Sequence, residues 1–317
     1  MLGKPTQQAL QLFAIAILFV FTPRILAGEI ALTFDDAPMR GTAIMSGNER
    51  TEKLIATLKE NKVPDVLFFV TTKNFNTEGR QRIERYTDAG FHLGSHSHSH
   101  KSANKIGVDH YMADARRAKA IIDQFDNTLP FHRFPYLHHG ADREAIETLN
   151  AELLKIGYSD GYVTVDNFDF YINSLIVKAK EQNKVINWQA AEQIYVEVLW
   201  QAIEFYDQLA KQTLQRSPKH VLLLHENDAA ALFIGALVKH IRQQGWTIIS
   251  PQEAYQDPIS QELPPGITLN QGRIAALALS KGVDKSKVRH PAEDEAYLEN
   301  LFKQRKVFSD NNLSQIQ

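Results

Sequence analysis

The order of strand-like and helix-like segments is the feature of this sequence that most limits its fold. Short runs rich in β-branched and aromatic residues alternate with longer amphipathic runs. The predicted strands are Glu29–Phe34, Val66–Thr71, Phe91–Gly94, Phe131–Phe134, Gly161–Val165, Val221–Leu224 and Trp246–Ile249. The predicted helices are Thr51–Asn61, Glu78–Ala89, Val108–Phe125, Arg143–Lys155 and Ala229–Gln244. Such alternation predicts an α/β fold built on parallel strands.

Two architectures share this alternation, the doubly wound sheet and the (β/α) barrel. A dinucleotide-binding sheet carries a glycine-rich turn after its first strand, and the residues after Phe34 contain no such turn. We therefore predict an α/β fold of the distorted (β/α)7-barrel type. In such a barrel the functional side chains lie at the carboxyl ends of the strands.

The same rhythm predicts how the chain is divided. We expect one domain over residues 28–255, interrupted by a helical insertion at about 172–216 and followed by a C-terminal extension over 256–317. The extension begins with a proline-rich stretch that predicts irregular structure, and its last residues predict a polar tail.

The first 27 residues have the character of a targeting segment. Lys4 precedes an apolar run over residues 9–21, and small residues follow at Ala27 and Gly28. This order predicts a signal peptide over residues 1–27 and an exported protein of the periplasm or the cell exterior. The alternative is a membrane anchor through residues 9–21, but that run is shorter than the roughly 20 residues a span requires. After cleavage we expect no stable membrane insertion.

Charge and cysteine content narrow the possible ligands. The net charge of −2 provides no basic surface of the kind that binds nucleic acid. The chain has no cysteine, so any metal site must use histidine and carboxylate ligands. Such ligands favour a catalytic divalent ion, most often zinc, with cobalt, nickel or iron as alternatives, over a closed structural zinc site.

Polar residues follow two of the predicted strands in dense groups. Asp35 and Asp36 follow the first strand, where a simple turn is the ordinary explanation. His96, His98 and His100 follow the third. All three would share one face of an extended strand, whereas only His96 and His100 share one face of a helical turn. In either case His96 and His100 can converge on one ion, and His98 is interpreted as a structural imidazole.

Single polar residues follow three further strands. Arg133 stands near the end of the fourth, Asp166 and Asp169 follow the fifth, and His225 follows the sixth. Each has an ordinary alternative as a surface cation, a helix cap or a buried hydrogen-bonded imidazole. Their shared position at strand ends nevertheless predicts one common site.

These residues, in this order, resemble the carbohydrate esterase family 4 polysaccharide deacetylases, which carry the NodB homology domain. The resemblance covers about residues 29–250 and rests on five short motifs: TFDD at 33–36, HSHSH at 96–100, RFPY at 133–136, DNFDF at 166–170 and LLH at 223–225. The family's distorted (β/α) barrel agrees with the predicted fold.

The resemblance implies a role for each residue at the metal. Asp36, His96 and His100 match the family's metal ligands. Asp35 matches the catalytic base, which takes a proton from the metal-bound water that attacks the substrate. Arg133 would hold Asp35 in place through a bidentate contact that lysine could not replace.

The resemblance also implies the proton donor and the pocket. His225 matches the acid that protonates the leaving amine, and one aspartate of the fourth motif would orient it, Asp169 being favoured over Asp166. The backbone N–H of Tyr136 would stabilise the oxyanion. Leu223 and Phe170 would form the pocket for the acetyl methyl group, with Phe170 standing where the family commonly has tryptophan.

The implied activity is metal-dependent removal of N-acetyl groups from a glycan such as peptidoglycan, a chitin-like polymer or poly-N-acetylglucosamine. Two alternatives remain open. The same site could hydrolyse O-acetyl esters of an acetyl-xylan type or small amides, or the chain could be a non-catalytic glycan- or metal-binding module. His138 and His139 depart from the family motif and are interpreted as surface-loop histidines, with substrate contact as the alternative.

Overall fold

The computed structural model describes residues 28–264 and 271–311 of the chain. Its main sheet has seven strands in the order β5-β4-β3-β2-β1-β7, and β8 pairs with Glu29 and Ile30 at the start of β1. All of these pairings are parallel. The strands are β1 (Glu29–Ala37), β2 (Leu67–Val70), β3 (His92–Ser95), β4 (Thr128–His132), β5 (Ser159–Asp160), β7 (Lys219–His225) and β8 (Thr247–Ile248).

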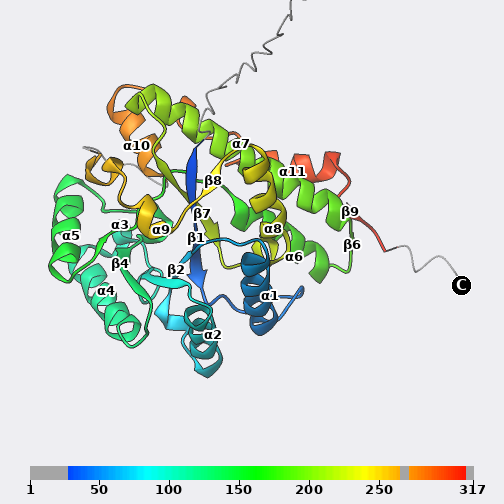
Figure 1. Ribbon diagram of the computed structural model, residues 1–317, viewed down its shortest axis with the longest axis horizontal. Coiled ribbons are helices and arrows are strands. Elements are labelled where there is room, and N and C mark those ends of the chain that lie inside the picture. The colour runs from blue at the N-terminus through cyan, green and yellow to red at the C-terminus, as the bar shows by residue number, and fades with distance from the viewer. Residues whose placement is uncertain (1–27, 265–270, 312–317) are drawn as a thin grey trace, which may run out of the picture.

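The strand β1 lies at the centre of the molecule (Figure 1). Its residues from Ile30 to Phe34 are wholly buried, as expected for a parallel strand covered on both faces. In the pairing of β1 with β7, Asp35 stands opposite His225. The parallel direction therefore brings two motifs that are far apart in sequence to the same edge of the sheet.

The sheet curls into a distorted barrel, because the segment of residues 159–165 pairs with strands on opposite sides of the sheet. At one end of this segment β5 pairs with β4, and at the other end Val165 forms a single bridge with Leu222 of β7. The predicted strand Gly161–Val165 is therefore wrong in extent, since the regular strand is confined to Ser159–Asp160. A β-carbon on Gly161 would lie 2.6 Å from the Phe69 ring, so the backbone passes too close to the core for a larger residue.

Helices pack around the outside of the sheet (Figure 1). The predicted helices are present, and several begin at side-chain caps; Ser46 and Glu49 form a reciprocal capping box at the start of α1. The helices between the strands are α1 (Gly47–Glu60), η1 (Thr72–Asn74), α2 (Thr77–Asp88), α3 (Ala103–Ile106), α4 (Val108–Ile122), η2 (Pro135–Leu137), α5 (Arg143–Lys155) and α8 (Asp228–Gln243).

The region predicted as a helical insertion forms two helices. They are α6 (Asp169–Glu181) and the long α7 (Trp188–Leu214), joined through the short strand β6 (Val185–Ile186). The helix α6 starts at Asp169, so the fourth motif lies at a helix start. The helix α7 packs against α8 and buries one face that includes Ile194, Val198 and Ile203.

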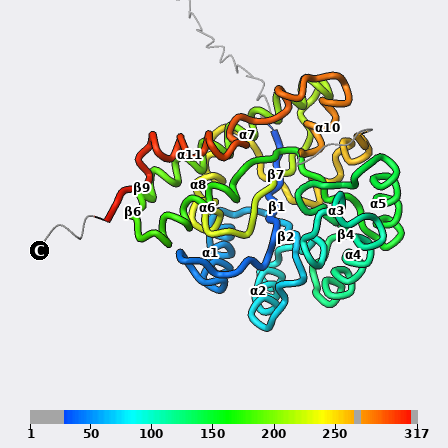
Figure 2. Tube along the Cα trace, turned by 180° about the vertical axis from the view of Figure 1, so that it is seen from behind, coloured from blue at the N-terminus to red at the C-terminus, as the bar shows by residue number. Residues whose placement is uncertain are grey.

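The C-terminal residues from Pro251 onward are folded onto the barrel over residues 251–264 and 271–309, and the polar tail predicted for the last residues lies largely outside the described residues. They form α9 (Pro251–Ala254), η3 (Pro258–Gln261), α10 (Arg273–Ser280), η4 (Lys285–Lys287), α11 (Glu295–Gln304) and β9 (Phe308–Ser309). The helix α10 packs against α7, and α11 lies beside α6 and α7 (Figure 1 and Figure 2). Ile274, Leu298 and Phe302 join the main hydrophobic core, so these residues are bound by ordinary apolar burial.

The predicted signal peptide lies outside the described residues. Within residues 28–264 and 271–311, none of the helices combines the length and apolar character needed to cross a bilayer. The division of the chain at residues 255 and 256 stays a prediction.

Candidate active site

The sequence motifs meet at one cavity of about 290 Å³ at the carboxyl edge of the sheet. Its lining comes from the ends of β1, β3 and β7 and from the loops that follow β4 and β5. It includes Asp35, Asp36, His96, His100, Tyr136, Asp166, Phe170, Leu223 and His225. A concave site of this size with a few convergent charges is typical of a small-molecule or substrate pocket.

Asp35 lies at the end of β1 and is buried against Arg133. The Arg133 Nη1 atom donates to Asp35 Oδ1 at 2.6 Å. Only this nitrogen contacts Asp35, so the predicted bidentate contact is wrong. The other guanidinium nitrogens are taken by Gly161 O at 2.7 Å and Tyr255 Oη at 3.0 Å.

Burial determines the protonation behaviour of Asp35. Desolvation raises the pKa of the Asp35 carboxyl above its ordinary value, although the positive charge of Arg133 and then that of His225 oppose it. A raised pKa suits a base, because a carboxylate that resists ionisation accepts a proton more readily. A cation held beside Asp35 would lower this pKa again.

Asp36, His96 and His100 are grouped as a metal ligand set would be. One ligand atom from each lies within 4.8 Å of the others. The His100 Nε2 atom is 3.2 Å from Asp36 Oδ1, and His96 Nε2 is 3.8 Å from the same oxygen. These three residues therefore fit a divalent ion with room for further ligands.

The neighbours of His96 prepare it for such a role. Its Nδ1 is 2.9 Å from the carbonyl oxygen of Arg133, which accepts a hydrogen bond and leaves Nε2 facing the ligand set. Burial, followed by the charge of His100, holds the pKa of His96 well below its ordinary value. A histidine kept neutral in this way is ready to donate a lone pair to a metal.

Several non-glycine residues at this site have strained backbone conformations. Asp36, Ser97, His100, Tyr136 and Leu137 all have positive φ angles between 53° and 68°. Non-glycine residues in this region cost of order 1–3 kcal/mol each, and such residues concentrate where side chains must be placed for function. Tyr136 lines the cavity, and its ring lies 4.7 Å from the ring of His100.

His225 lies across the cavity from the ligand set and is held by Asp169. The His225 Nδ1 atom is 2.6 Å from Asp169 Oδ1, and the backbone N–H of His225 donates to Asp169 Oδ2 at 3.0 Å. Asn227 donates to the same Oδ2 at 3.1 Å. Burial alone would lower the pKa of His225, but chiefly Asp169 raises it to about 9. The imidazole is therefore protonated at neutral pH and can donate a proton from Nε2.

Asp166 lines the same cavity, and its hydrogen bond goes to Asn167 and not to His225. Its Oδ1 accepts from the backbone N–H of Asn167 at 2.8 Å. Burial, then the nearby Glu293, raises the pKa of Asp166 well above its ordinary value. Phe170 packs with its ring 5.6 Å from that of His225, and Leu223 lines the same apolar side of the cavity.

The remaining histidines of the HSHSH motif and its strand lie outside the ligand set. His98 Nδ1 is 2.8 Å from Thr72 Oγ1, and its backbone N–H donates to Asp114. His92 Nδ1 is 2.8 Å from Asp65 Oδ2. Both are therefore held by structural hydrogen bonds of the loops around the site.

Comparison of the sequence with protein-family models gives a match for the N-terminal part of the chain. The family model described as polysaccharide deacetylase matches residues 26–153. That segment supplies Asp35, Asp36, His96, His100 and Arg133. Residues 26–153 are therefore similar to a polysaccharide deacetylase domain. The resemblance to this family drawn from the motifs is confirmed.

Solved structures of deacetylases share the fold. The chitin deacetylase from the fungal pathogen Colletotrichum lindemuthianum is 20% identical, with a TM-score of 0.52 over 73% of this chain and 88% of that one. The carbohydrate esterase family 4 pseudoenzyme BA3943 from Bacillus anthracis is 15% identical, with a TM-score of 0.50 over 71% of this chain and 64% of that one. The predicted distorted barrel is thereby confirmed. No curated protein sequence matches the chain.

One residue of this cavity comes from far outside the matched segment. Arg289, which follows η4, lines the same cavity as Asp35 and His225. Its Nε donates to Glu293 at 3.2 Å, and its guanidinium lies over the Phe168 ring at 5.4 Å. The motifs did not point to Arg289, because its position depends on how the C-terminal segment folds back.

A buried ion network lies next to the candidate site. Glu226, next to His225, accepts from Arg82 Nη2 at 2.7 Å, from Tyr86 Oη at 2.8 Å and from the backbone N–H of Met39 at 2.7 Å. Met39 lies in the loop after β1 and lines the cavity. The network therefore ties the end of β7 to the loop that follows the two aspartates.

Proposed function

We propose that this chain is a metal-dependent hydrolase that removes N-acetyl groups from a polysaccharide or oligosaccharide, such as peptidoglycan, a chitin-like polymer or poly-N-acetylglucosamine. The observation that carries the proposal is the convergence of a buried carboxylate, a metal-type ligand set and a protonated histidine on one cavity. The deacetylase family match and the fold shared with a chitin deacetylase support the substrate class.

Asp36, His96 and His100 would hold the ion, most often zinc, with cobalt, nickel or iron as alternatives. When bound, such an ion lowers the pKa of water and polarises a carbonyl oxygen. The three residues bring one negative charge to the ion, so the site keeps a net positive character that favours a developing oxyanion.

Asp35 would act as the base. It lies beside the ligand set, with its Oδ2 3.7 Å from His96 Nε2 and its Oδ1 fixed by Arg133. A carboxylate fixed by one oxygen keeps the other free to receive a proton from the attacking water. Arg133 is a positioning residue in this account, since it acts through Asp35.

His225 would act as the acid. Amide hydrolysis needs a proton for a poor leaving group, and an imidazole with a pKa of about 9 carries that proton at neutral pH. Asp169 holds Nδ1, so Nε2 is the atom that donates. An amide nitrogen must be protonated before it leaves, more strictly than an ester oxygen, so a protonated His225 favours N-acetyl over O-acetyl substrates.

The substrate acetyl group would lie between Tyr136 and the apolar wall. The Tyr136 backbone N–H is proposed to stabilise the oxyanion, and Leu223 and Phe170 would receive the methyl group. The predicted signal peptide supports export to the periplasm or the cell exterior, where acetylated glycans occur.

A substrate panel tests the proposal. Acetate release should be measured on peptidoglycan, N-acetylchitooligomers, poly-N-acetylglucosamine, acetyl-xylan and simple amides, with zinc content determined on the same preparation. We expect release from an N-acetylated glycan to exceed release from acetyl-xylan. Faster hydrolysis of acetyl-xylan would assign an O-deacetylase, and bound zinc without turnover of any member would assign a non-catalytic module.

A further inference from the structure

The cavity of the candidate site holds one cation that the proposed reaction does not use. Arg289 follows η4 and lines this cavity together with Asp35 and His225. The proposed base, acid and metal ligands are all other residues, so the chemistry leaves this guanidinium without a task. The Arg289 side chain is 46% exposed and is therefore open to a ligand.

A buried glutamate holds Arg289 by one nitrogen. Arg289 Nε donates to Glu293 Oε2 at 3.2 Å, and the Glu293 side chain is fully buried. The glutamate is itself fixed, because Tyr206 Oη donates to its Oε1 at 2.5 Å and the backbone N–H of His290 donates to the same oxygen at 3.2 Å. Within the described part of the chain, neither Nη atom of Arg289 makes a hydrogen bond. A guanidinium anchored in this way presents its two terminal nitrogens as a fork that matches a carboxylate.

A series of aromatic rings joins Arg289 to the proposed acid. The guanidinium lies over the Phe168 ring at 5.4 Å. The Phe168 ring is 4.8 Å from the Phe170 ring, which is 5.6 Å from the ring of His225. All four residues line the same cavity. Arg289 therefore contacts the cavity wall and not the proton donor, which suits a group that recognises a substituent of the substrate rather than one that acts on the breaking bond.

The positive charge of Arg289 is available although two carboxyl groups lie near it. Burial, followed by the charge of Glu293, raises the pKa of Asp166 well above its ordinary value, and burial raises the pKa of Glu293 as well. Two buried carboxyl groups that resist ionisation balance the positive charge of Arg289 only in part.

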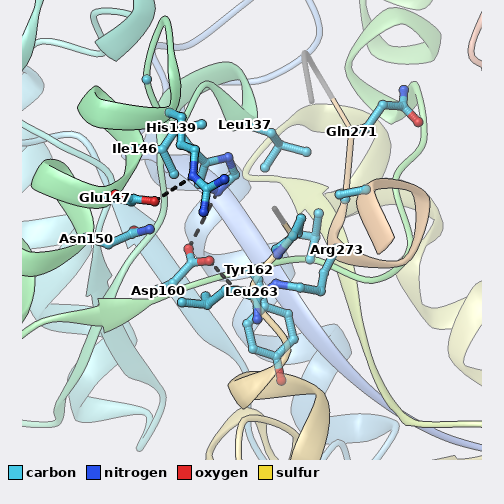
Figure 3. Close-up of a pocket in the computed structure, with 16 residues that line it drawn as sticks. Leu137, His139, Ile146, Glu147, Asn150, Asp160, Tyr162, Leu263, Gln271 and Arg273 are labelled. Carbon is cyan, nitrogen blue, oxygen red and sulfur yellow. Dashed lines mark hydrogen bonds and ion pairs between the residues drawn. The ribbon is translucent and has the colours of Figure 1, made fainter. Parts of the chain in front are cut away.

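The neighbouring cavity, shown in Figure 3, provides a contrast. There Arg273 donates to Asp160 Oδ2, and the second oxygen of this carboxylate lies 3.8 Å from His139 Nε2. The Arg273 guanidinium also donates to the carbonyl oxygen of Ile259 at 3.0 Å. The arginine of that cavity is therefore a structural group, whereas Arg289 has donors left for a ligand.

The number of cations limits the kind of anion that the cavity suits. Among the described residues that line the cavity of the candidate site, Arg289 is the one arginine or lysine. A single guanidinium fork matches the two oxygens of a singly charged carboxylate. A doubly charged phosphate would keep one charge unmatched at this wall. The ligand group that Arg289 suits best is therefore a carboxylate.

We propose that Arg289 selects N-acetylated sugar units that carry a carboxylate close to the acetamido group, and that it holds this carboxylate through its two Nη atoms. The inference rests on the proposed function, because it takes the glycan class from that reaction and adds an acidic substituent to it. A neutral chitin-like polymer would leave the guanidinium unpaired. Since Arg289 lies beyond residues 26–153, this selectivity comes from the C-terminal segment and not from the part of the chain that matches the deacetylase family.

Two matched probes and two matched variants test the assignment. One probe is the disaccharide of N-acetylglucosamine and N-acetylmuramic acid, whose lactyl group ends in a carboxylate, and the other is the same disaccharide with that carboxylate converted to a carboxamide. The variants are Arg289→Gln and the control Arg305→Gln. Arg305 follows α11, is 47% exposed and pairs with Glu197 at 3.0 Å, so it matches Arg289 in exposure and kind of partner but lies outside the cavity.

The readout is the ratio of kcat/KM for acetate release from the carboxylate probe to that from the carboxamide probe. Arg289→Gln should lower this ratio about tenfold, since the hydrogen bonds between two charged groups are lost. Arg305→Gln should keep the wild-type ratio. Because both probes are measured on the same variant, any loss of folded protein cancels in the ratio.

Titration calorimetry of the two probes with the full chain separates this inference from the proposed function. Tighter binding of the carboxylate probe, abolished in Arg289→Gln and kept in Arg305→Gln, supports the inference even where neither probe releases acetate and the proposed function fails. Acetate release with the same probe ratio in the wild type and Arg289→Gln overturns the inference alone. A wild-type chain that releases acetate from N-acetylchitohexaose, but neither binds nor hydrolyses the carboxylate probe, also overturns the inference and keeps the proposed function.

Discussion

The pH dependence of an Asp169→Asn variant offers a sharp test of the proton-donor assignment. In the structure His225 has a pKa of about 9, which Asp169 raises against the opposing effect of burial. Without that carboxylate, burial should bring the pKa to its ordinary value of about 6.5 or below. At pH 8 an imidazole with a pKa of 9 is about 90% protonated, and one with a pKa of 6.5 is about 3% protonated. The population of the acid form therefore falls by about 30-fold.

The assay is kcat/KM for acetate release as a function of pH. A protonated donor is lost as the pH rises through its pKa, so the wild-type rate should decline above about pH 9. The decline of Asp169→Asn should begin below about pH 6.5, with its rate near the wild-type value only on the acid side. Asp166→Asn is the matched control and should keep the alkaline limit, since the Asp166 carboxyl bonds to the backbone of Asn167 and not to His225. An unchanged alkaline limit in Asp169→Asn would refute the reasoning.

Three further predictions concern the support of the site. Glu226→Gln should lower the free energy of unfolding by about 3–5 kcal/mol, because it removes the carboxylate that pairs with the buried Arg82. Arg85→Ala at an exposed ion pair should cost about 1 kcal/mol or less, and urea denaturation measures both changes. Zinc should raise the thermal unfolding midpoint of the wild type but not that of His100→Ala, which lacks one of the proposed ligands. His98→Ala is the control and should respond to zinc as the wild type does. An equal rise of the midpoint in all three proteins would place the metal elsewhere. Arg133→Lys should reduce kcat by about tenfold or more with little change in KM. One lysine ammonium group cannot replace the four hydrogen bonds that the Arg133 guanidinium donates. A change in KM alone would contradict the positioning role of Arg133.

Much of the site could be predicted because parallel strands end at a common edge. Asp35 and His225 are far apart in sequence, yet both follow apolar runs of the parallel type, and their strands are neighbours with these residues in register. Local patterns were therefore sufficient to place the motif residues together. The family resemblance and the barrel were confirmed, while the roles assigned to the residues stay proposals.

The parts that sequence could not predict depend on long-range packing. Nothing near Gly161 indicates that Phe69 limits its strand, and nothing near Arg133 indicates that Tyr255 takes one of its nitrogens. Arg289 reaches the cavity only because the C-terminal segment folds back on α6 and α7. Such contacts carry no local signal, since the residues involved are ordinary surface types in sequence.

The most direct test of the account is acetate release by Asp35→Asn from an N-acetylated glycan, with zinc content and thermal midpoint measured on the same sample. The substituted amide would keep the shape of the side chain and lose the capacity of the carboxylate to accept a proton. The account predicts that acetate release falls by about 100-fold or more, while the bound zinc and the fold are retained. Wild-type rates in Asp35→Asn, with zinc bound, would contradict it.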